Sequence, residues 1–348
     1  MADPAPVTTD QKKSLWDRIV TSTPVVLTVL ATAVAGLSSS EMTRSMYFRS
    51  LAAQQQSKAS DQWNFFQAKR IRGSNLESTV ELLQSLTPAG PFDPERLAGQ
   101  CRELSAQLDK AGSEAVAAKQ SADRLAKMLG DPEKQKALEF VTKRTLPKVE
   151  QGAREDPEVA RRLAEAMKAV SERQTESQTV HLVRQLTADQ IDGELGIWEK
   201  LGDDFDKACT PTVDAVKELR GAARDLAAQI ATLPKASSTD ARPLADAVQA
   251  TIKTAGLDFD GRRYRQEATY NQRSGEIYDI RVRRSAVESD VHLARSKNFF
   301  YAMLLLQAGV VIASLAVARR TRSPFWLLAA LAGAAGLAFT GYVYLTLR

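Results

Sequence analysis

The residues best able to carry out chemistry are few in this chain of 348 residues. Its two histidines, His181 and His292, each lack a second histidine or a cysteine at metal-ligand spacing. The acidic run 189–194 begins like a calcium-binding loop, but Lys200 stands where such a loop needs its closing glutamate. We therefore predict no metal and no other cofactor, and we treat His292 as a candidate for a pH-sensitive contact.

Enzymatic motifs are missing as well. The sequence has no phosphate-binding glycine loop, no dinucleotide fingerprint and no nucleophile elbow. Carboxylate pairs such as Asp203 and Asp204 are expected by chance in a chain of which 26% of the residues are charged. An enzyme would have to assemble its site from scattered residues. We predict no catalytic residues, no small-molecule substrate and a protein that is not an enzyme.

Cys101 and Cys209 are the only cysteines of the chain. Two thiols so far apart in sequence fix no redox compartment. We expect both to be small, buried core residues, and a disulfide between them is the alternative.

The elements that would position these residues are apolar or strongly charged. Three segments carry no charge and are long enough to cross the hydrocarbon core of a bilayer as helices, namely residues 19–37, 298–318 and 324–347. The polar side chain of Gln307 is expected to bond a neighbouring helix. None of the three segments holds an ionisable group, and such groups usually mark transport pathways, so a transporter or ion pump is disfavoured.

The remaining boundaries follow from these segments. We assign residues 1–18 to an N-terminal tail, 38–297 to a helical coiled-coil domain and 319–323 to a basic loop. Strand signals are absent from the long middle region, because its β-branched residues are scattered without alternation. The predicted fold is all-α, with one N-terminal transmembrane helix, a C-terminal transmembrane hairpin, and an elongated coiled-coil or bundle domain between them.

Charge predicts the orientation in the membrane. Arg319, Arg320 and Arg322 crowd a short loop, and short basic loops stay in the cytoplasm. This places the N-terminus in the cytoplasm and the middle domain outside it. Basic residues within 281–297 favour the reverse, and residues 33–35 resemble a signal-peptidase site. Because the net charge of +5 arises mostly around the loop, we predict no nucleic-acid partner.

Small side chains recur at fourfold spacing in each apolar segment, which lets helix backbones approach closely in a membrane. The candidates for such helix packing are Thr28, Thr32, Gly36, Gly309, Ala313, Gly333 and Gly336. Ordinary use of glycine and alanine in membrane helices is the alternative interpretation.

Two stretches of the middle domain repeat apolar residues at alternating spacings of four and three, which is the pattern of a coiled-coil seam. One seam runs from Leu97 to Leu125, and the other, which contains Pro211, runs from Phe205 to Leu233. The larger seam residues are Leu97, Leu104, Leu108, Leu219, Leu226 and Ile230. The seams could pair within one chain or between copies, and the short breaks between helices favour antiparallel neighbours in a bundle.

Proline and glycine mark the expected helix boundaries. Asp-Pro-Glu sequences begin at Asp93, Asp131 and Asp156, and each is predicted to start a helix with proline in its first turn. Weaker breaks and linkers are expected at residues 189–193, Gly202, 236–243 and 256–261.

Segments at both ends of the middle domain resemble a known family. Residues 59–72 (ASDQWNFFQAKRIR), 271–284 and 295–303 (RSKNFFYAM) are similar to the uncharacterised bacterial family catalogued as domain of unknown function 4337. The resemblance covers roughly residues 20–75 and 262–347. The central helices, residues 86–256, look like a long insertion relative to shorter members.

The resemblance implies a protein of the bacterial inner membrane and assigns it no activity. It gives weight to the matched residues Gln62, Trp63, Gln67 and Lys69, although solvated helix surface is the alternative for the polar ones. Trp63 is expected to pack against the helix that leads into the second span.

The predicted function is that of a membrane-anchored structural or interaction protein. Its partners would be the lipid bilayer and, through the coiled coil, a second copy of the chain or another protein. One alternative is a sensory or regulatory subunit that relays a signal to a separate partner. Another is a small oligomeric channel or transport accessory.

Overall fold

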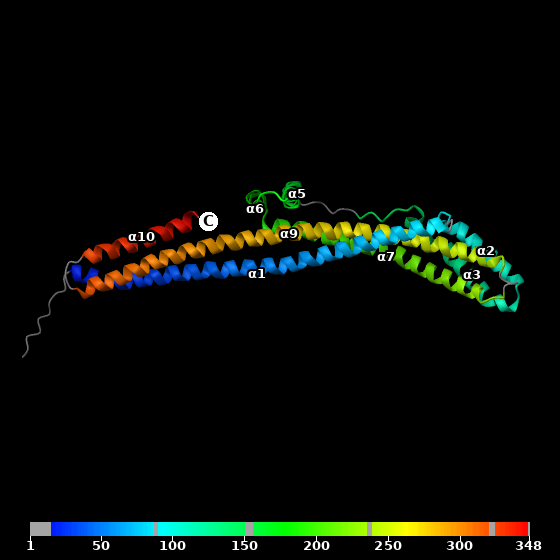
Figure 1. Ribbon diagram of the computed structural model, residues 1–348, viewed down its shortest axis with the longest axis horizontal. Helices are drawn as coiled ribbons and strands as arrows, with labels where there is room; N and C mark the ends of the chain where they lie inside the picture. The colour runs from blue at the N-terminus through cyan, green and yellow to red at the C-terminus, as the bar shows by residue number, and fades with distance from the viewer. Residues whose placement is uncertain (1–14, 87–89, 150–155, 235–238, 320–323, 347–348) are drawn as a thin grey trace, which may run out of the picture. The chain divides into compact units, whose positions relative to one another are not determined.

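The computed structural model describes residues 15–86, 90–149, 156–234, 239–319 and 324–346 (Figure 1). The described residues are almost entirely helical and include no strand, which confirms the all-α prediction. The elements are α1 (Leu15–Leu86), α2 (Pro94–Lys110), the short 3-10 helix η1 (Ser113–Ala115), α3 (Val116–Gly130), α4 (Pro132–Thr142), α5 (Pro157–Ser171), α6 (Glu176–Arg184), α7 (Ala188–Ala231), α9 (Ala241–Ala318) and α10 (Pro324–Thr346).

The chain divides into two compact units. The apolar unit comprises residues 1–54 and 282–348, and the bundle unit comprises residues 55–281. Both division points fall inside α1 and α9, which continue through them without a break.

The apolar unit holds the three helices that are long and apolar enough to cross a membrane. Its core is formed by α1, α9 and α10, and Pro24 lies within α1 without ending it. Glycine permits the close packing of these helices. A Cβ atom on Gly309 would lie 3.3 Å from the carbonyl oxygen of Ala329, and one on Gly333 would lie 2.6 Å from Leu27.

A ladder of polar pairs joins α1 to α9 beyond the apolar segments of this unit. The hydroxyls of Ser38 and Ser296 each donate to the other residue's backbone oxygen, both at 2.9 Å. Further along, the hydroxyl of Ser289 donates to the backbone oxygen of Ser45 at 3.0 Å, and the two hydroxyls lie 3.1 Å apart. Between the two serine pairs, His292 Nδ1 lies 2.6 Å from Glu41 Oε2. Residue numbers rise along α1 as they fall along α9, so the two helices are antiparallel here. A pH-sensitive role for His292 stays a prediction.

The bundle unit has one large core, shared by α2, α3, α4, α7 and α9. The second predicted seam is buried along a single face of α7 from Phe205 to Ile230, and its last residue, Leu233, is buried just beyond the end of the helix. Pro211 does not end that helix. The first seam is not one helix. The chain turns between Lys110 and Val116, and α2 and α3 pack against each other, so its two halves face one another instead of forming a single stripe.

Cys101 and Cys209 lie in this core as free, buried thiols. Burial raises the pKa of each thiol to about 12. The expectation of small, buried core residues is thus confirmed, and the alternative of a disulfide is not.

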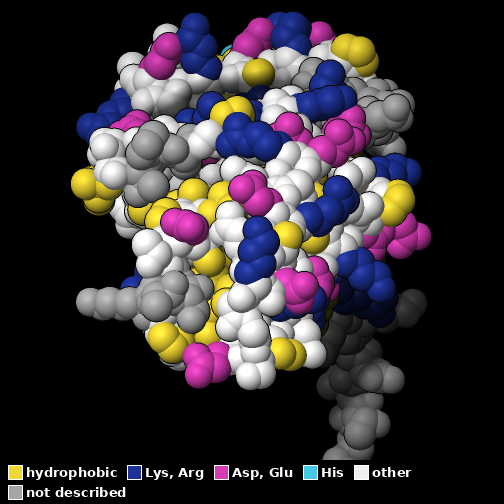
Figure 2. Space-filling model, turned by 90° about the vertical axis from the view of Figure 1, so that its right-hand side faces the viewer, with side chains coloured by type: hydrophobic (Ala, Val, Ile, Leu, Met, Phe, Trp, Pro, Cys, Tyr) yellow, Lys and Arg dark blue, Asp and Glu magenta, His cyan; other side chains and the backbone are white. Residues whose placement is uncertain are grey.

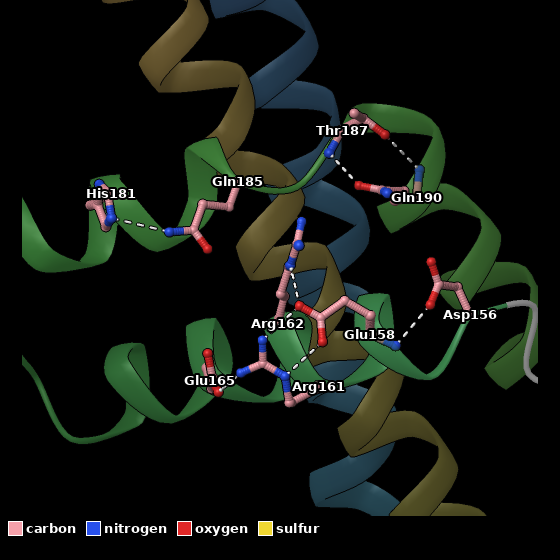
Figure 3. A network of polar contacts seen from close by, with 9 residues as sticks. All are labelled: Asp156, Glu158, Arg161, Arg162, Glu165, His181, Gln185, Thr187 and Gln190. Carbon is pink, nitrogen blue, oxygen red and sulfur yellow. Dashed lines mark hydrogen bonds and ion pairs between the residues drawn. The ribbon is translucent and has the colours of Figure 1, made fainter.

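Helix starts follow the predicted chemistry. Asp93, Asp131 and Asp156 each cap a helix with a side-chain oxygen, and proline follows directly. Figure 3 shows the last of these caps, with the amide of Glu158 donating to Asp156 at 2.8 Å. It also shows Thr187 and a glutamine three residues later closing a capping box at the start of α7.

Two of the expected breaks and one expected linker are wrong. Residues 189–193 and Gly202 lie inside α7, and residues 256–261 lie inside α9. In α9 the glycines serve close approach between helices. A Cβ atom on Gly256 would lie 2.4 Å from Nε of Arg220, while Gly261 faces Gly73 of α1.

Basic and acidic side chains are intermixed on the end of the molecule drawn in Figure 2, with hydrophobic side chains visible between them. This agrees with a middle region whose charges nearly cancel. Any strongly charged surface of the bundle unit must therefore arise from where its charged side chains lie, and not from an excess of one charge in the sequence.

We predict opposite effects for two glycine-to-alanine changes inside helices. Gly256→Ala should lower the free energy of unfolding by about 1–3 kcal/mol, because the new methyl group meets Arg220 and Val216. Gly196→Ala, with no atom within 4 Å of its new Cβ, should raise it by about 0.5–1 kcal/mol. Thermal unfolding of the purified chain measures both, and equal effects would contradict the packing role of Gly256.

Candidate functional site: an acidic groove on the bundle unit

A groove lies between α1, α7 and α9 of the bundle unit, with a volume of about 460 Å³. We call it the acidic groove. Its lining residues are Gln62, Phe65, Lys69, Trp198, Glu199, Gly202, Asp203, Asp206, Glu267, Tyr270, Asn271 and Ser274.

The groove brings together two segments from opposite ends of the middle region, residues 59–72 and 271–284. Gln62 and Lys69 line it from α1, and Asn271 and Ser274 line it from α9. Gln67 is exposed outside the lining. Of the four residues singled out in the segment 59–72, the groove therefore contains two, Gln62 and Lys69.

Trp63 instead fixes the pairing of the two long helices beside the groove. Its indole Nε1 donates to Asp279 Oδ2 at 3.1 Å, and a Cβ atom on Gly275 would lie 3.3 Å from the ring. The tryptophan therefore packs on α9, as its sequence position predicted. The anchor holds α1 and α9 in register where they present Gln62 and Asn271.

An ion pair forms the base of the groove. The Lys69 ammonium lies 3.0 Å from a carboxylate oxygen of Glu267, and the Arg263 guanidinium lies 3.1 Å from the other oxygen. Glu267 is only 5% exposed, and burial raises the pKa of its carboxyl group against the opposing effect of Lys69 and Arg263. The amide nitrogen of Asn271 is buried without a hydrogen-bond partner among the described residues. The base therefore combines a compensated charge with spare hydrogen-bonding capacity.

Aromatic rings form one wall of the groove. Tyr270 packs against Phe205 with ring centroids 5.5 Å apart, and against Trp198 at 6.4 Å. Gly202 of α7 faces this wall, and a Cβ atom there would lie 3.8 Å from Tyr270. Phe65 adds an exposed ring from α1. These faces suit a partner that is partly apolar.

Three acids of α7 form the rim. Glu199, Asp203 and Asp206 stand at i, i+4 and i+7, so they share one face of the helix. Among the described residues neither aspartate has an ion-pair partner, whereas the adjacent Asp204 pairs with Lys207. Glu199 accepts a hydrogen bond from Tyr278 at 2.9 Å. Like charges on one face repel each other, and a bound cation would relieve that repulsion.

This rim was not predicted from the sequence, where Asp203 and Asp204 were interpreted as a chance pair. The helical spacing of the acids around them is the signal that could have found the face. The contribution of Glu267 could not be found that way, because only the packing of α1 on α9 shows which lysine it meets.

The other predicted residues lie elsewhere. Thr28 and Thr32 are exposed and bond carbonyl oxygens of their own helix, and a Cβ atom on Gly36 would have no atom within 4 Å. Arg319 stacks on Phe325 at 5.0 Å. Arg320 and Arg322 lie outside the described residues. The remaining small residues pack between α1, α9 and α10, namely Gly309, Ala313, Gly333 and Gly336.

Residues 16–141 and 216–346 match the family described as Domain of unknown function (DUF4337). The chain belongs to this family. No curated protein and no solved structure matches it significantly. The matched regions are wider than the resemblance suggested, so the internal segment outside the DUF4337 pattern is residues 142–215 and not 86–256.

The segment outside the DUF4337 pattern completes the groove. It includes α5, α6 and the part of α7 that carries Trp198 and the acidic rim. The apolar side chains of α5, α6 and the first turns of α7 form a second core with Ala59 of α1 and with Ile277 and Ile280 of α9. On its outer surface, Figure 3 shows Glu158 joined to two arginines within α5. The helices that match the family therefore supply the base of the groove, and the segment outside the match supplies its acidic rim.

We predict that Lys69→Met lowers the free energy of unfolding at pH 7 by about 2 kcal/mol, because Glu267 loses a charged partner while buried. Loss of the ammonium raises the carboxyl pKa further, so protonation at lower pH should shrink the difference from the wild type. Chemical unfolding between pH 5 and 8 measures both. Gln67→Met is the exposed control on the same helix, and a penalty independent of pH would contradict the prediction.

Proposed function

We propose that this protein is a membrane-anchored, non-enzymatic interaction protein whose bundle unit binds a basic segment of a partner protein in the acidic groove. The single observation that carries the proposal is the rim of α7, where Asp203 and Asp206 are exposed without a cationic partner among the described residues. A lysine or arginine of a partner would pair with them, and its alkyl stem would cover Phe65.

We propose the acidic groove, and not the two predicted seams, as the surface that binds the partner. The seam residues from Phe205 to Leu233 and those of α2 and α3 are buried within one chain. A partner could reach them only after the core had opened, and opening would expose leucine side chains at about 1.5–3 kcal/mol each. Binding through the groove requires no such opening.

Self-association in the membrane is the second arrangement that the structure supports. Gln307 is exposed on the apolar part of α9 and makes no hydrogen bond among the described residues. Thr28 and Thr32 are also exposed, on α1. An amide facing hydrocarbon is stabilised when it bonds another helix, and small residues permit close approach, so two copies would satisfy both features.

Site-specific photocrosslinking in growing cells tests the interaction. A crosslinking residue at Phe65, which is 56% exposed and lines the groove, should give one discrete adduct. The same residue at Gln67, about 200° away around the helix, should give none. Asp203→Lys with Asp206→Lys should abolish the Phe65 adduct. Equal labelling from both positions would contradict the proposal, and an adduct of two copies would assign the groove to self-association.

We further propose that the protein resides in a bacterial inner membrane with its bundle unit outside the cytoplasm. The support is the arginine content of the short loop between α9 and α10, since such loops stay in the cytoplasm. The family resemblance supports the bacterial membrane. The exposed Ser113 of the bundle unit is a suitable reporter of sidedness.

Labelling with a membrane-impermeant maleimide tests the orientation. Wild-type protein should stay unlabelled near pH 8, because both native thiols are buried and have a pKa of about 12. Ser113→Cys should be labelled in intact cells. Labelling of that variant only after permeabilisation would place the bundle unit in the cytoplasm and reverse the orientation.

A further inference from the structure

A second groove lies on the bundle unit between α7 and α9, with a volume of about 470 Å³. We call it the basic groove. Its lining residues are Lys217, Arg220, Gly221, Arg224, Gln249 and Lys253. Four of the six are cations and none is acidic, although the middle region of the chain is close to neutral.

The four cations share one surface by helix geometry. Lys217, Arg220 and Arg224 stand at i, i+3 and i+7 on α7, and Lys253 follows Gln249 by one turn on α9. Like charges at these spacings destabilise a helix by about 0.2–0.5 kcal/mol per pair, so the arrangement costs stability unless an anion lies between them.

Nearby acids neutralise this surface only at Arg220, which pairs with Asp260 of α9. Among the described residues, neither Lys217 nor Lys253 has a carboxylate within ion-pair distance, and Arg224 meets only the adjacent Asp225 at 3.9 Å. The neighbouring Glu218 pairs with Lys134 of α4 instead. Elsewhere on α9, cations such as Arg262 do have carboxylate partners.

Arg220 is held in place by the protein itself. One guanidinium nitrogen donates to Asp260 at 3.1 Å, and the side chain lies over Gly256, where any Cβ atom would displace it. Lys217, Arg224 and Lys253 are the exposed cations around this fixed one. A fixed guanidinium loses little entropy when it binds an oxyanion.

We propose that the basic groove binds a small anion that carries two or more phosphate groups. Its volume falls in the range of small-molecule sites, and its donors are the guanidinium, ammonium and amide groups that bind phosphate oxygens. Because Arg220 already pairs with Asp260, a monocarboxylate would have to balance Lys217, Arg224 and Lys253, and its single charge would leave most of these three without a close counter-charge. The site lies in the region that matches DUF4337 and is separate from the acidic groove.

Isothermal titration of the full chain in zwitterionic nanodiscs with inorganic pyrophosphate tests the site. Wild-type protein should bind one equivalent, and Lys217→Gln or Lys253→Gln should each weaken binding about tenfold, which corresponds to loss of one charged contact. Lys127→Gln, which removes an exposed cation of α3 that lines neither groove, should leave binding unchanged.

Arg224→Lys should retain more affinity than Arg224→Gln, and circular dichroism should show unchanged helix content in every variant. Absence of saturable binding, or an equal loss in the Lys127 control, would overturn the proposal. A repeat in nanodiscs with anionic phospholipid separates two sources of phosphate. Competition that disappears in the Lys217 variant would assign the groove to lipid headgroups, and unchanged binding would assign it to a soluble ligand.

Discussion

The antiparallel pairing of α1 with α9 is the constraint on which each unit depends. In the apolar unit, Ser38 and Ser296 exchange hydrogen bonds with each other's backbone, which requires small side chains at the contact. In the bundle unit, Gly73 and Gly261 face one another for the same reason. Larger residues would separate the helices at either contact. Separation in the bundle unit would remove Lys69 from Glu267 and open the base of the acidic groove.

Charge along α7 is divided between two surfaces. The first half of the helix presents Asp203 and Asp206 to the acidic groove, and the second half presents Lys217 and Arg224 to the basic groove. The apolar face of the same helix is buried throughout. A middle region whose charges nearly cancel can thus display two strongly charged surfaces. Burial of the apolar face fixes the rotation of the helix, and the sequence then decides which charges face each groove.

Residues 142–215, which lie outside the DUF4337 match, pack on the helices that the family covers. DUF4337 covers α1, α2, α3, α9, α10, nearly all of α4 and the later part of α7. The main core of the bundle also takes Phe205, Cys209 and Ala215 from the segment outside the match. The helices α5 and α6 and the first turns of α7 form a second core against Ala59 and Ile277, so this segment extends the bundle as well as contributing to its main core. An addition of this kind can change what a surface binds while the fold that carries it stays the same.

The sequence by itself determined the helical class, the three apolar helices and the starts of α2, α4 and α5. These features depend on local properties, namely hydrophobic length and the caps at Asp93, Asp131 and Asp156. Only the tertiary structure decided that α2 and α3 fold back on each other, that the glycines of α9 are contact points, and that Lys69 meets Glu267. Those outcomes depend on residues far apart in the chain, and no local pattern specifies which distant side chain will fill a given space.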